Sequence, residues 1–254
     1  MFAFESQAHA YLRAAATGRG GRAVRTGPFT VGIDPHDAGL FFNYAIPDDG
    51  AEPTDDQVRR LVETFTSRSR TPRLEYLPAA APLVEDALVA SGFTAERRLP
   101  ILTCDPADAP APRVAGPVEV LLAETDAQLR KVAEAQGEAY QQPVTGEHDV
   151  ARLRSVLDRG GLVALALDTA SGQGVGGGQM GPPHQGVSEL AAIGVRVAYR
   201  RRGIASALHA ALTRACPSVG ITTPFLMPED DDTERISQRA GYRRVSEILH
   251  ISLR

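Results

Sequence analysis

The chain has 254 residues, with 27 Lys and Arg against 31 Asp and Glu, which gives a formal net charge of −4 at pH 7. This balance offers no electrostatic basis for binding nucleic acid or an anionic membrane, so we expect neither as a partner. No apolar run approaches the roughly 18 residues that a membrane-spanning helix needs. The first residues also lack the basic start and apolar core of a signal peptide. We therefore expect a cytoplasmic protein, and the preference for Ala, Gly and Arg over Lys is typical of a GC-rich bacterial genome.

The two cysteines, Cys104 and Cys216, lie far apart in the sequence and form no metal-ligand pattern. We therefore predict neither a metal site nor a disulfide framework.

Strand and helix patterns alternate through residues 1–104. In order, they predict a helix over 3–16, strands over 29–33 and 40–46, a helix over 54–65, a strand over 73–77, a helix over 82–92, and one bent strand or a strand pair over 93–104. The aromatic run at 40–46 has the strongest strand signal of this half. Thr54 and Gln57 have the spacing of a helix capping box.

A proline-rich segment follows at residues 105–112, where three prolines stand among small and acidic residues. Such a segment propagates neither a helix nor a central strand, so it is predicted to be a linker. We place the domain boundary here, with one domain over residues 1–112 and a second over 113–254. A single domain with a long, unrelated N-terminal extension is the alternative.

The second half has a longer series of elements. The patterns predict strands over 118–122, 162–167, 174–180, 190–195, 221–227 and 245–253, and helices over about 126–140, 150–157, 204–215 and 233–240. Thr125 and Gln128 have capping-box spacing, and Asp232 or Thr233 is the expected cap of the last helix. The order predicts an α/β fold with a mixed sheet.

The turn between strand 190–195 and helix 204–215 has an unusual composition. Three consecutive arginines, residues 200–202, precede Gly203 at the start of the helix, and Ala205 and Ser206 leave room beside it. The first N–H groups of a helix have no partner within it, and the helix dipole makes this end positive. The turn is therefore predicted to bind a pyrophosphate. It is neither a P-loop nor a dinucleotide-binding turn, because the lysine of the first and two glycines of the second are missing.

This turn, Arg200-x-x-Gly203-x-Ala205, resembles the acyl-CoA-binding motif of the GNAT acetyltransferases. Residues 234–242, a helix ending in Gly241-Tyr242, resemble the second signature of that family. The resemblance implies the GNAT acyl-CoA transferase fold with acetyl-CoA as co-substrate. It implies that the backbone of residues 201–206 holds the CoA pyrophosphate. The expected cofactor-binding residues are Ile193, Val195, Arg200, Arg201, Arg202, Gly203, Ile204, Ala205 and Ser206. An ordinary basic helix start on the surface is the alternative.

The first half repeats the strand and helix order of such a domain more faintly, without the cofactor turn. Its corresponding segment carries five carboxylates, at Asp48, Asp49, Glu52, Asp55 and Asp56, which would repel a pyrophosphate. We therefore expect two tandem GNAT-like domains, of which the N-terminal one is degenerate and shapes the substrate cleft or mimics a second subunit.

The resemblance also implies catalytic residues. Glu189, eleven residues before Arg200, has the position of the general base in one branch of the family. A solvated glutamate at a strand edge is the equally weighted alternative. The other candidates for the base are His148, His184, Glu147 and Asp149, all in predicted loops. The family's usual tyrosine acid is replaced by Ser237, a far poorer acid. The amide of Val195 is expected to stabilise the thioester oxygen.

We expect an N-acetyltransferase in which the amine of a small molecule or peptide attacks acetyl-CoA directly. A non-catalytic acyl-CoA-binding or regulatory protein is the alternative, and an O- or thiol-acyltransferase is a third hypothesis. The acidic run at residues 229–232 would attract a cationic amine, or it is a solvated helix cap. A homodimer is compatible with this reading.

Overall fold

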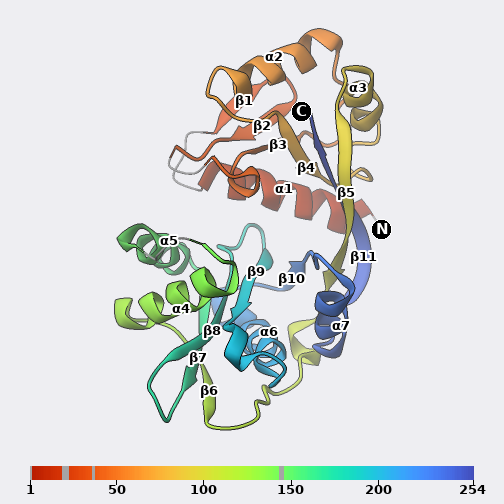
Figure 1. Ribbon diagram of the computed structural model, residues 1–254. Coiled ribbons are helices and arrows are strands. Elements are labelled where there is room, and N and C mark those ends of the chain that lie inside the picture. Colours follow the sequence, from red (N-terminus) through yellow and green to blue (C-terminus); the bar gives the residue numbers. More distant parts are fainter. Residues whose placement is uncertain (1, 19–22, 36–37, 143–145) are drawn as a thin grey trace. The chain divides into compact units, whose positions relative to one another are not determined.

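The computed structural model describes residues 2–18, 23–35, 38–142 and 146–254. These residues form two compact units, the first made of residues 1–101 and 245–254 and the second of residues 102–244 (Figure 1). The sequence placed its boundary in the proline-rich segment and assigned the last ten residues to the second half. The compact units instead place those ten residues with the first hundred. Whether the first unit is a degenerate acetyltransferase domain stays a prediction.

The first unit contains three helices and a mixed sheet among its described residues. Its helices are α1 (Phe2–Gly18), α2 (Asp55–Thr66) and α3 (Val84–Ala90), and its strands are β1 (Val24–Thr26), β2 (Phe29–Gly32), β3 (Tyr44–Pro47), β4 (Arg73–Tyr76), β5 (Thr94–Thr103) and β11 (Arg243–Ser252). The strand order is β1-β2-β3-β4-β11-β5. The β3–β4 pair is parallel, and β4 and β11 are antiparallel. The predicted capping box is present, with the Thr54 side chain accepting from the Gln57 N–H.

The strand predicted over 40–46 is wrong in its first half. Residues Leu40–Phe42 form a 3-10 turn, and the strand begins only at Tyr44. The cause is the buried side chain of Asn43. Its Nδ2 donates to the carbonyl oxygen of Gly39 at 2.8 Å, and its Oδ1 accepts from the N–H of Asp34 at 2.9 Å. These local side-chain to backbone bonds compete with strand pairing and override the β propensity of the aromatic run.

The second unit is a five-stranded mixed sheet covered by helices. Its strands are β6 (Val118–Leu122), β7 (Leu162–Asp168), β8 (Gly174–Met180), β9 (Val187–Val195) and β10 (Thr223–Leu226), and its helices are α4 (Asp126–Ala139), α5 (Glu147–Asp158), α6 (Ile204–Ala215) and α7 (Asp231–Arg239). The order is β10-β9-β8-β7-β6, and only the β9–β10 pair is parallel. The capping box of α4 is present as predicted, whereas the cap of α7 is Asp230, two residues earlier than expected.

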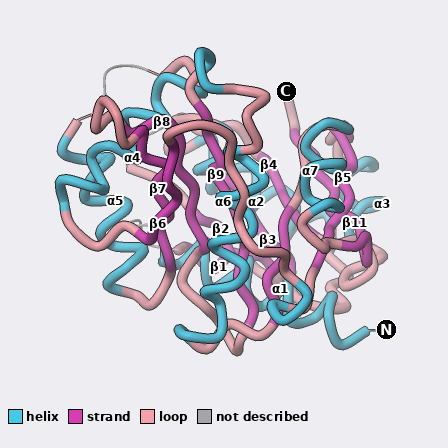
Figure 2. The backbone as a smooth tube through the Cα atoms, turned by 90° about the horizontal axis from the view of Figure 1, so that it is seen from below, coloured by secondary structure: helices cyan, strands magenta, loops and turns pink. Residues whose placement is uncertain are grey.

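Alternation along β7 builds a core on each face of this sheet. Leu162, Ala164 and Ala166 belong to one cluster with residues of α6, and Val163 and Leu165 belong to the other with residues of α4 and α5. Figure 2 shows α4 and α5 on one side of these strands and α6 on the other. Successive side chains of a strand point to opposite faces, so one apolar strand supplies both cores.

The glycine-rich strand β8 lies buried within the sheet between these two layers of helices. A Cβ at Gly177 would lie 2.6 Å from Val132 of α4, and a Cβ at Gly178 would overlap Ile193 next to α6. The glycines are therefore required by close packing on both faces. The α/β fold with a mixed sheet is as predicted. None of the described helices is both long enough and apolar enough to cross a membrane.

Candidate functional site

The turn between β9 and α6 has a backbone that presents a series of unpaired donors. Gly203 is the N-cap of α6 with φ +80°, and Arg201 is also left-handed with φ +64°. Within the described part of the chain, no acceptor takes a hydrogen bond from the backbone N–H of residues 201–206. Six consecutive donors at the positive end of a helix form a site suited to an anion.

The three arginines of the turn play different roles. Arg200 donates from Nε to the carbonyl oxygen of Val195 at 3.2 Å and from Nη2 to that of Ala139 at 3.3 Å, so it fixes the turn to β9 and α4. Arg202 donates to the carbonyl oxygen of Ala198 at 3.1 Å. The exposed side chain of Arg201 has no partner among the described residues, which leaves its charge available to a ligand.

Tyr199 anchors the preceding 3-10 turn (Val197–Tyr199). Its hydroxyl donates to Asp168 Oδ2 at 2.8 Å, and the guanidinium of Arg202 lies 4.9 Å from the centre of its ring. The hydrogen bond lowers the pKa of Asp168 and raises that of Tyr199, because it favours the carboxylate and the neutral phenol. The side chain of Tyr199 thus ties the start of the turn to the end of β7.

Strand β9, which leads into the turn, has one edge that is only partly paired. On the β8 side, pairing runs from Leu190 to Val195. On the β10 side, it covers residues 187–189 and stops where Glu189 faces Phe225. Among the described strands, none pairs with β9 over residues 190–195 on this side, and we call this stretch the open edge. An extended ligand with amide groups could pair with it as a further strand would.

A β-bulge interrupts β9 next to this edge. Ala191 faces Gln179 and Gly194 faces Gly177, so two residues of β9 stand opposite one of β8. One of the two, Ala192, is left-handed with φ +55°. A bulge reverses the alternation of the residues beyond it.

This reversal decides where the backbone of Val195 points. The carbonyl oxygen of Glu189 accepts from the N–H of Gly181 on the β8 side, and the N–H of Arg196 donates to the carbonyl oxygen of Val175, also on the β8 side. Without the bulge, every odd-numbered residue from Glu189 onward would direct its backbone N–H and C=O groups toward β8. With the bulge, Val195 turns its N–H and C=O toward the open edge. The predicted donor to the thioester oxygen is therefore placed where a ligand on that edge could reach it.

Glu189 lies at the last paired position of β9, where the open edge begins. Its side chain is half-buried, and it lies on the opposite face of the strand from Leu190, which packs in the α6 core. This is a position from which a carboxylate can act on a group bound along the open edge. Its role as base stays a prediction.

Ser237 and Tyr242 both lie inside the second unit. Ser237 is fully buried, and its hydroxyl donates to the carbonyl oxygen of Thr233 at 2.9 Å within the same helix. This geometry gives no support to the predicted acid role, which stays a prediction. Tyr242 is also buried. Its hydroxyl and the Thr213 hydroxyl share a hydrogen bond of 2.7 Å, and burial strongly raises its pKa.

The other candidates for the base have structural contacts of their own. Glu147 pairs with Arg130 at 2.6 Å, and the Asp149 carboxylate accepts from the N–H of Gly146 at 2.9 Å at the start of α5. His184 lies in the β8–β9 turn, bridged to Val187, and His148 is exposed on α5.

In the acidic run, Asp230 caps α7 and accepts from the N–H of Thr233 at 2.7 Å, and Asp232 pairs with Arg235. These contacts favour the helix-capping interpretation of the run.

Sequence reasoning missed two residues near the open edge, Gln136 and Tyr140, both from α4 and its C-cap. A Cβ on Gly194 would lie 3.2 Å from Gln136 Cα and 3.4 Å from Tyr140 Cε2, so both residues pack against the backbone of β9. No sequence pattern marks either residue, because they meet β9 only in the folded unit.

The corresponding turn of the first unit is occupied by contacts within the chain. Asp48 pairs with Arg25, and Asp49 accepts from Ser6 and Arg13 and bonds to His9 Nδ1 at 2.8 Å.

Three backbone N–H groups of this loop are also bonded internally, in contrast to the cofactor turn. Asp48 donates to Pro28 at 2.8 Å, Gly50 to Ala80 at 2.7 Å, and Ala51 to Asp48 at 3.2 Å. This arrangement supports the prediction that the first unit does not bind CoA there.

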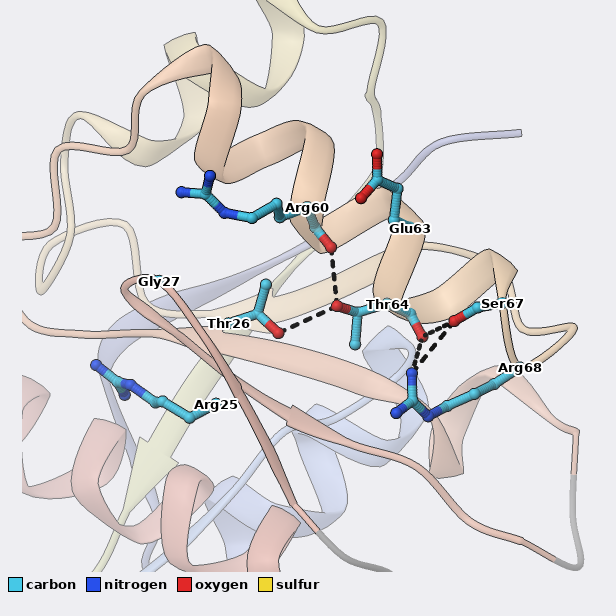
Figure 3. A pocket seen from close by; sticks show the side chains of 8 residues that line it. All are labelled: Arg25, Thr26, Gly27, Arg60, Glu63, Thr64, Ser67 and Arg68. Atoms are coloured by element: carbon cyan, nitrogen blue, oxygen red, sulfur yellow. Dashed lines mark hydrogen bonds between the residues drawn. The ribbon is translucent and has the colours of Figure 1, made fainter.

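A separate hollow of about 560 Å³ lies on the first unit between the β1–β2 turn and α2 (Figure 3). Two of its arginines are engaged by neighbours, Arg25 with Asp48 and Arg68 with the carbonyl oxygen of Thr64 and the hydroxyl of Ser67. These contacts account for the two arginines structurally, and the predicted site residues do not line this hollow.

Comparison with solved structures identifies the fold. The chain is similar to the GCN5-related N-acetyltransferase from Kribbella flavida, with a TM-score of 0.77 and 23% identity over 97% of this chain and 95% of that one. The corresponding protein from Sphaerobacter thermophilus gives a TM-score of 0.66, with 18% identity over 89% of this chain and 77% of that one. A tandem GNAT protein from the clavulanic acid biosynthesis pathway gives 0.63, with 12% identity over 91% and 81%. The chain has the GNAT fold.

The family follows from the sequence of the second unit. Residues 129–242 match the model of the acetyltransferase (GNAT) family, so the second unit contains a GNAT acetyltransferase domain. The resemblance drawn from the turn and from residues 234–242 is confirmed. No curated protein sequence matches the chain.

Proposed function

We propose that the protein is an acetyl-CoA-dependent N-acetyltransferase that acts on an amine of a small molecule or peptide. The observation that carries the proposal is the row of six backbone N–H groups at residues 201–206 that have no acceptor among the described residues, directly after a strand with an open edge. This arrangement lies in a GNAT acetyltransferase domain, a class that uses acyl-CoA.

In this proposal the backbone of residues 201–206 holds the pyrophosphate, and the side chain of Arg201 adds a charge. The extended pantetheine arm, which carries two amides, pairs with the open edge near Ile193 and Val195. The side chain of Ile204 is buried in the core, so this residue contributes its N–H alone. Ala205 and Ser206 are small enough to let the phosphates approach the helix start.

The residues at the two ends of the open edge, Glu189 and Val195, have different roles in the proposed reaction. Glu189 accepts the proton that the attacking amine loses, directly or through a water. The amine nitrogen forms a bond to the thioester carbonyl carbon, and the N–H of Val195 stabilises the negative charge on its oxygen. When the carbon–sulfur bond breaks, the thiolate takes a proton. Ser237 is the side chain predicted for this last step, although its hydroxyl donates within its own helix.

A non-catalytic acyl-CoA-binding protein is the second candidate, because Ser237 is buried and no other acid has been assigned. Transfer to a hydroxyl or thiol is the third, since none of the named residues selects the acceptor atom. Both alternatives retain the turn and the open edge, so binding alone does not separate them from the main proposal.

Calorimetry followed by an acceptor screen tests the proposal. Acetyl-CoA, CoA, desulfo-CoA and dephospho-CoA are titrated into the full chain, and release of free thiol is then measured with a panel of amines, alcohols and thiols. Micromolar binding with thiol release only on addition of amines supports an N-acetyltransferase. Binding without turnover supports the non-catalytic alternative. Absence of binding overturns both.

A further inference from the structure

Gln136 on α4 holds the carbonyl group of the bulge residue Ala192. Its Nε2 donates to the carbonyl oxygen of Ala192 at 2.7 Å, and the residue is only 4% exposed. The bond joins two elements 56 residues apart in the sequence. Ala192 is the residue at which the alternation of β9 reverses, so the contact is made at the point that turns Val195 toward the open edge.

The bulge needs such a partner because its backbone is strained. A left-handed conformation at a residue other than glycine costs on the order of 1–2 kcal/mol. The carbonyl group of a bulge is also displaced from the ladder of strand hydrogen bonds and, when buried, must find another donor. Gln136 supplies that donor.

The amide oxygen of the same side chain indicates that Gln136 is needed for more than stability. Gln136 Oε1 is buried and accepts no hydrogen bond from any residue that the structure describes. A buried oxygen left in this way costs on the order of 1–3 kcal/mol. A methionine of similar length would pack in the same space without that cost, although it would leave the Ala192 carbonyl without its donor.

We propose that Gln136 is a positioning residue for acyl transfer, which fixes the bulge at Ala192 and so directs the N–H of Val195 to the thioester oxygen. The inference rests on the proposed function. Gln136 touches neither the turn nor the substrate in this role and acts only through the backbone of β9. It separates two parts of the site, since the turn at residues 201–206 holds the pyrophosphate and the bulge sets the direction of the Val195 N–H.

The first test is Gln136→Met, which removes the donor and keeps the length. We expect kcat to fall about 10- to 100-fold, less than the roughly 10²- to 10³-fold loss that follows removal of an oxyanion-hole donor, because the Val195 N–H is displaced and not removed. The Kd of ADP, which carries the pyrophosphate and no pantetheine arm, should stay within about twofold, because the turn is unchanged. The matched control is Val132→Ala, which removes packing between the same helix and β8 at Gly177. If kcat of Gln136→Met is within twofold of wild type, or falls no more than in the control, the inference is wrong.

A second substitution tests whether Gln136 acts by stabilising the bulge at Ala192. Glycine adopts a left-handed conformation at no steric cost, so Ala192→Gly should keep the bulge even when the hydrogen bond from Gln136 is missing. The double variant Gln136→Met with Ala192→Gly is expected to recover a large part of the lost kcat. No recovery would mean that Gln136 acts in some way other than through the bulge.

Hydrogen exchange distinguishes failure of this inference from failure of the proposed function. In Gln136→Met, amides of residues 190–196 should exchange faster than in wild type, with α6 unchanged, whether or not the protein has activity. Unchanged exchange in β9 overturns the inference. A wild-type protein without turnover overturns the proposed function, and the exchange result then still tests whether Gln136 stabilises the bulge.

Discussion

The guanidinium Nε of Arg200 donates a hydrogen bond of 3.2 Å to the carbonyl oxygen of Val195, five residues earlier in the chain. The bond ties the end of strand β9 to the turn that precedes α6. The turn and the open edge are therefore fixed to one another before any ligand arrives, which lowers the ordering cost of binding.

This bond makes Arg200 more than a positive charge. Arg200→Lys keeps the charge but cannot reach the carbonyl oxygens of Val195 and Ala139 with the same planar fork. We expect the affinity for acetyl-CoA to fall about tenfold, the equivalent of roughly 1.4 kcal/mol. Arg201→Lys, at the neighbouring residue without a partner among those described, should change the affinity less than twofold. Calorimetry of the two variants checks this difference, and equal losses would contradict it.

Substitution of Gly203 should abolish binding by distorting the turn. Valine is poorly tolerated at φ +80°, and a Cβ at Gly203 would lie 3.2 Å from the carbonyl oxygen of Arg113. We expect Gly203→Val to weaken acetyl-CoA binding at least about 30-fold, or roughly 2 kcal/mol. The control is Gly172→Val, where φ is +71° but no atom lies within 4 Å of the added Cβ. That variant should lose stability and keep its affinity.

Glu189→Gln tests the proposed base. Removal of a general base lowers the rate about 10²- to 10⁴-fold, and the low-pH limb of the kcat/KM profile should disappear with the carboxylate. The affinity for CoA should stay unchanged. The exposed Glu119→Gln on β6 serves as the control. A profile that keeps its low-pH limb in Glu189→Gln would exclude Glu189 as the base.

Ser237→Ala tests the acid predicted from the sequence. Because the hydroxyl donates to Thr233 in its own helix, we expect kcat to change less than about twofold and unfolding free energy by no more than about 1 kcal/mol. Steady-state kinetics and urea unfolding measure the two quantities. A tenfold loss of kcat with normal stability would instead restore the acid role of Ser237.

The buried histidines predict a stability that falls with acid. Burial lowers the pKa of His209 on α6 to about 4, whereas an unfolded chain has a histidine pKa near 6.5. Between these values the unfolded state takes up a proton that the folded state does not, so the free energy of unfolding decreases as pH falls from about 6.5 to 4. His9 and His250 of the first unit are shifted in the same direction, also to about 4.

Urea unfolding of wild type and His209→Leu at pH 7, 5.5 and 4.5 isolates the contribution of His209. The variant should lose less stability than wild type over this range, by up to roughly 3 kcal/mol. Parallel curves for the two proteins would show that His209 does not contribute.

The features that the sequence predicted correctly depend on interactions between residues close together in the chain. The cap of α2 at Thr54, the cap of α4 at Thr125 and the glycine before α6 all depend on neighbours within a few residues, and these were predicted correctly. The bulge at Ala192 could not be predicted, because alanine gives no local signal for a left-handed backbone and its partner Gln136 lies 56 residues away. The strand predicted at 40–46 failed for a related reason, since the contacts of Asn43 outweighed an aromatic pattern.

The grouping of residues 245–254 with residues 1–101 bears on how this chain could have been assembled and how it can be divided. Strand β11 pairs with β4 over Leu249–Ser252, so a fragment that ends at the proline-rich segment leaves β4 without that neighbour. The coding sequence of the first unit is therefore not a single continuous stretch, because the second unit, residues 102–244, lies within it. One recombination point in the linker would separate β11 from β4 and would not transfer a complete first unit to another protein.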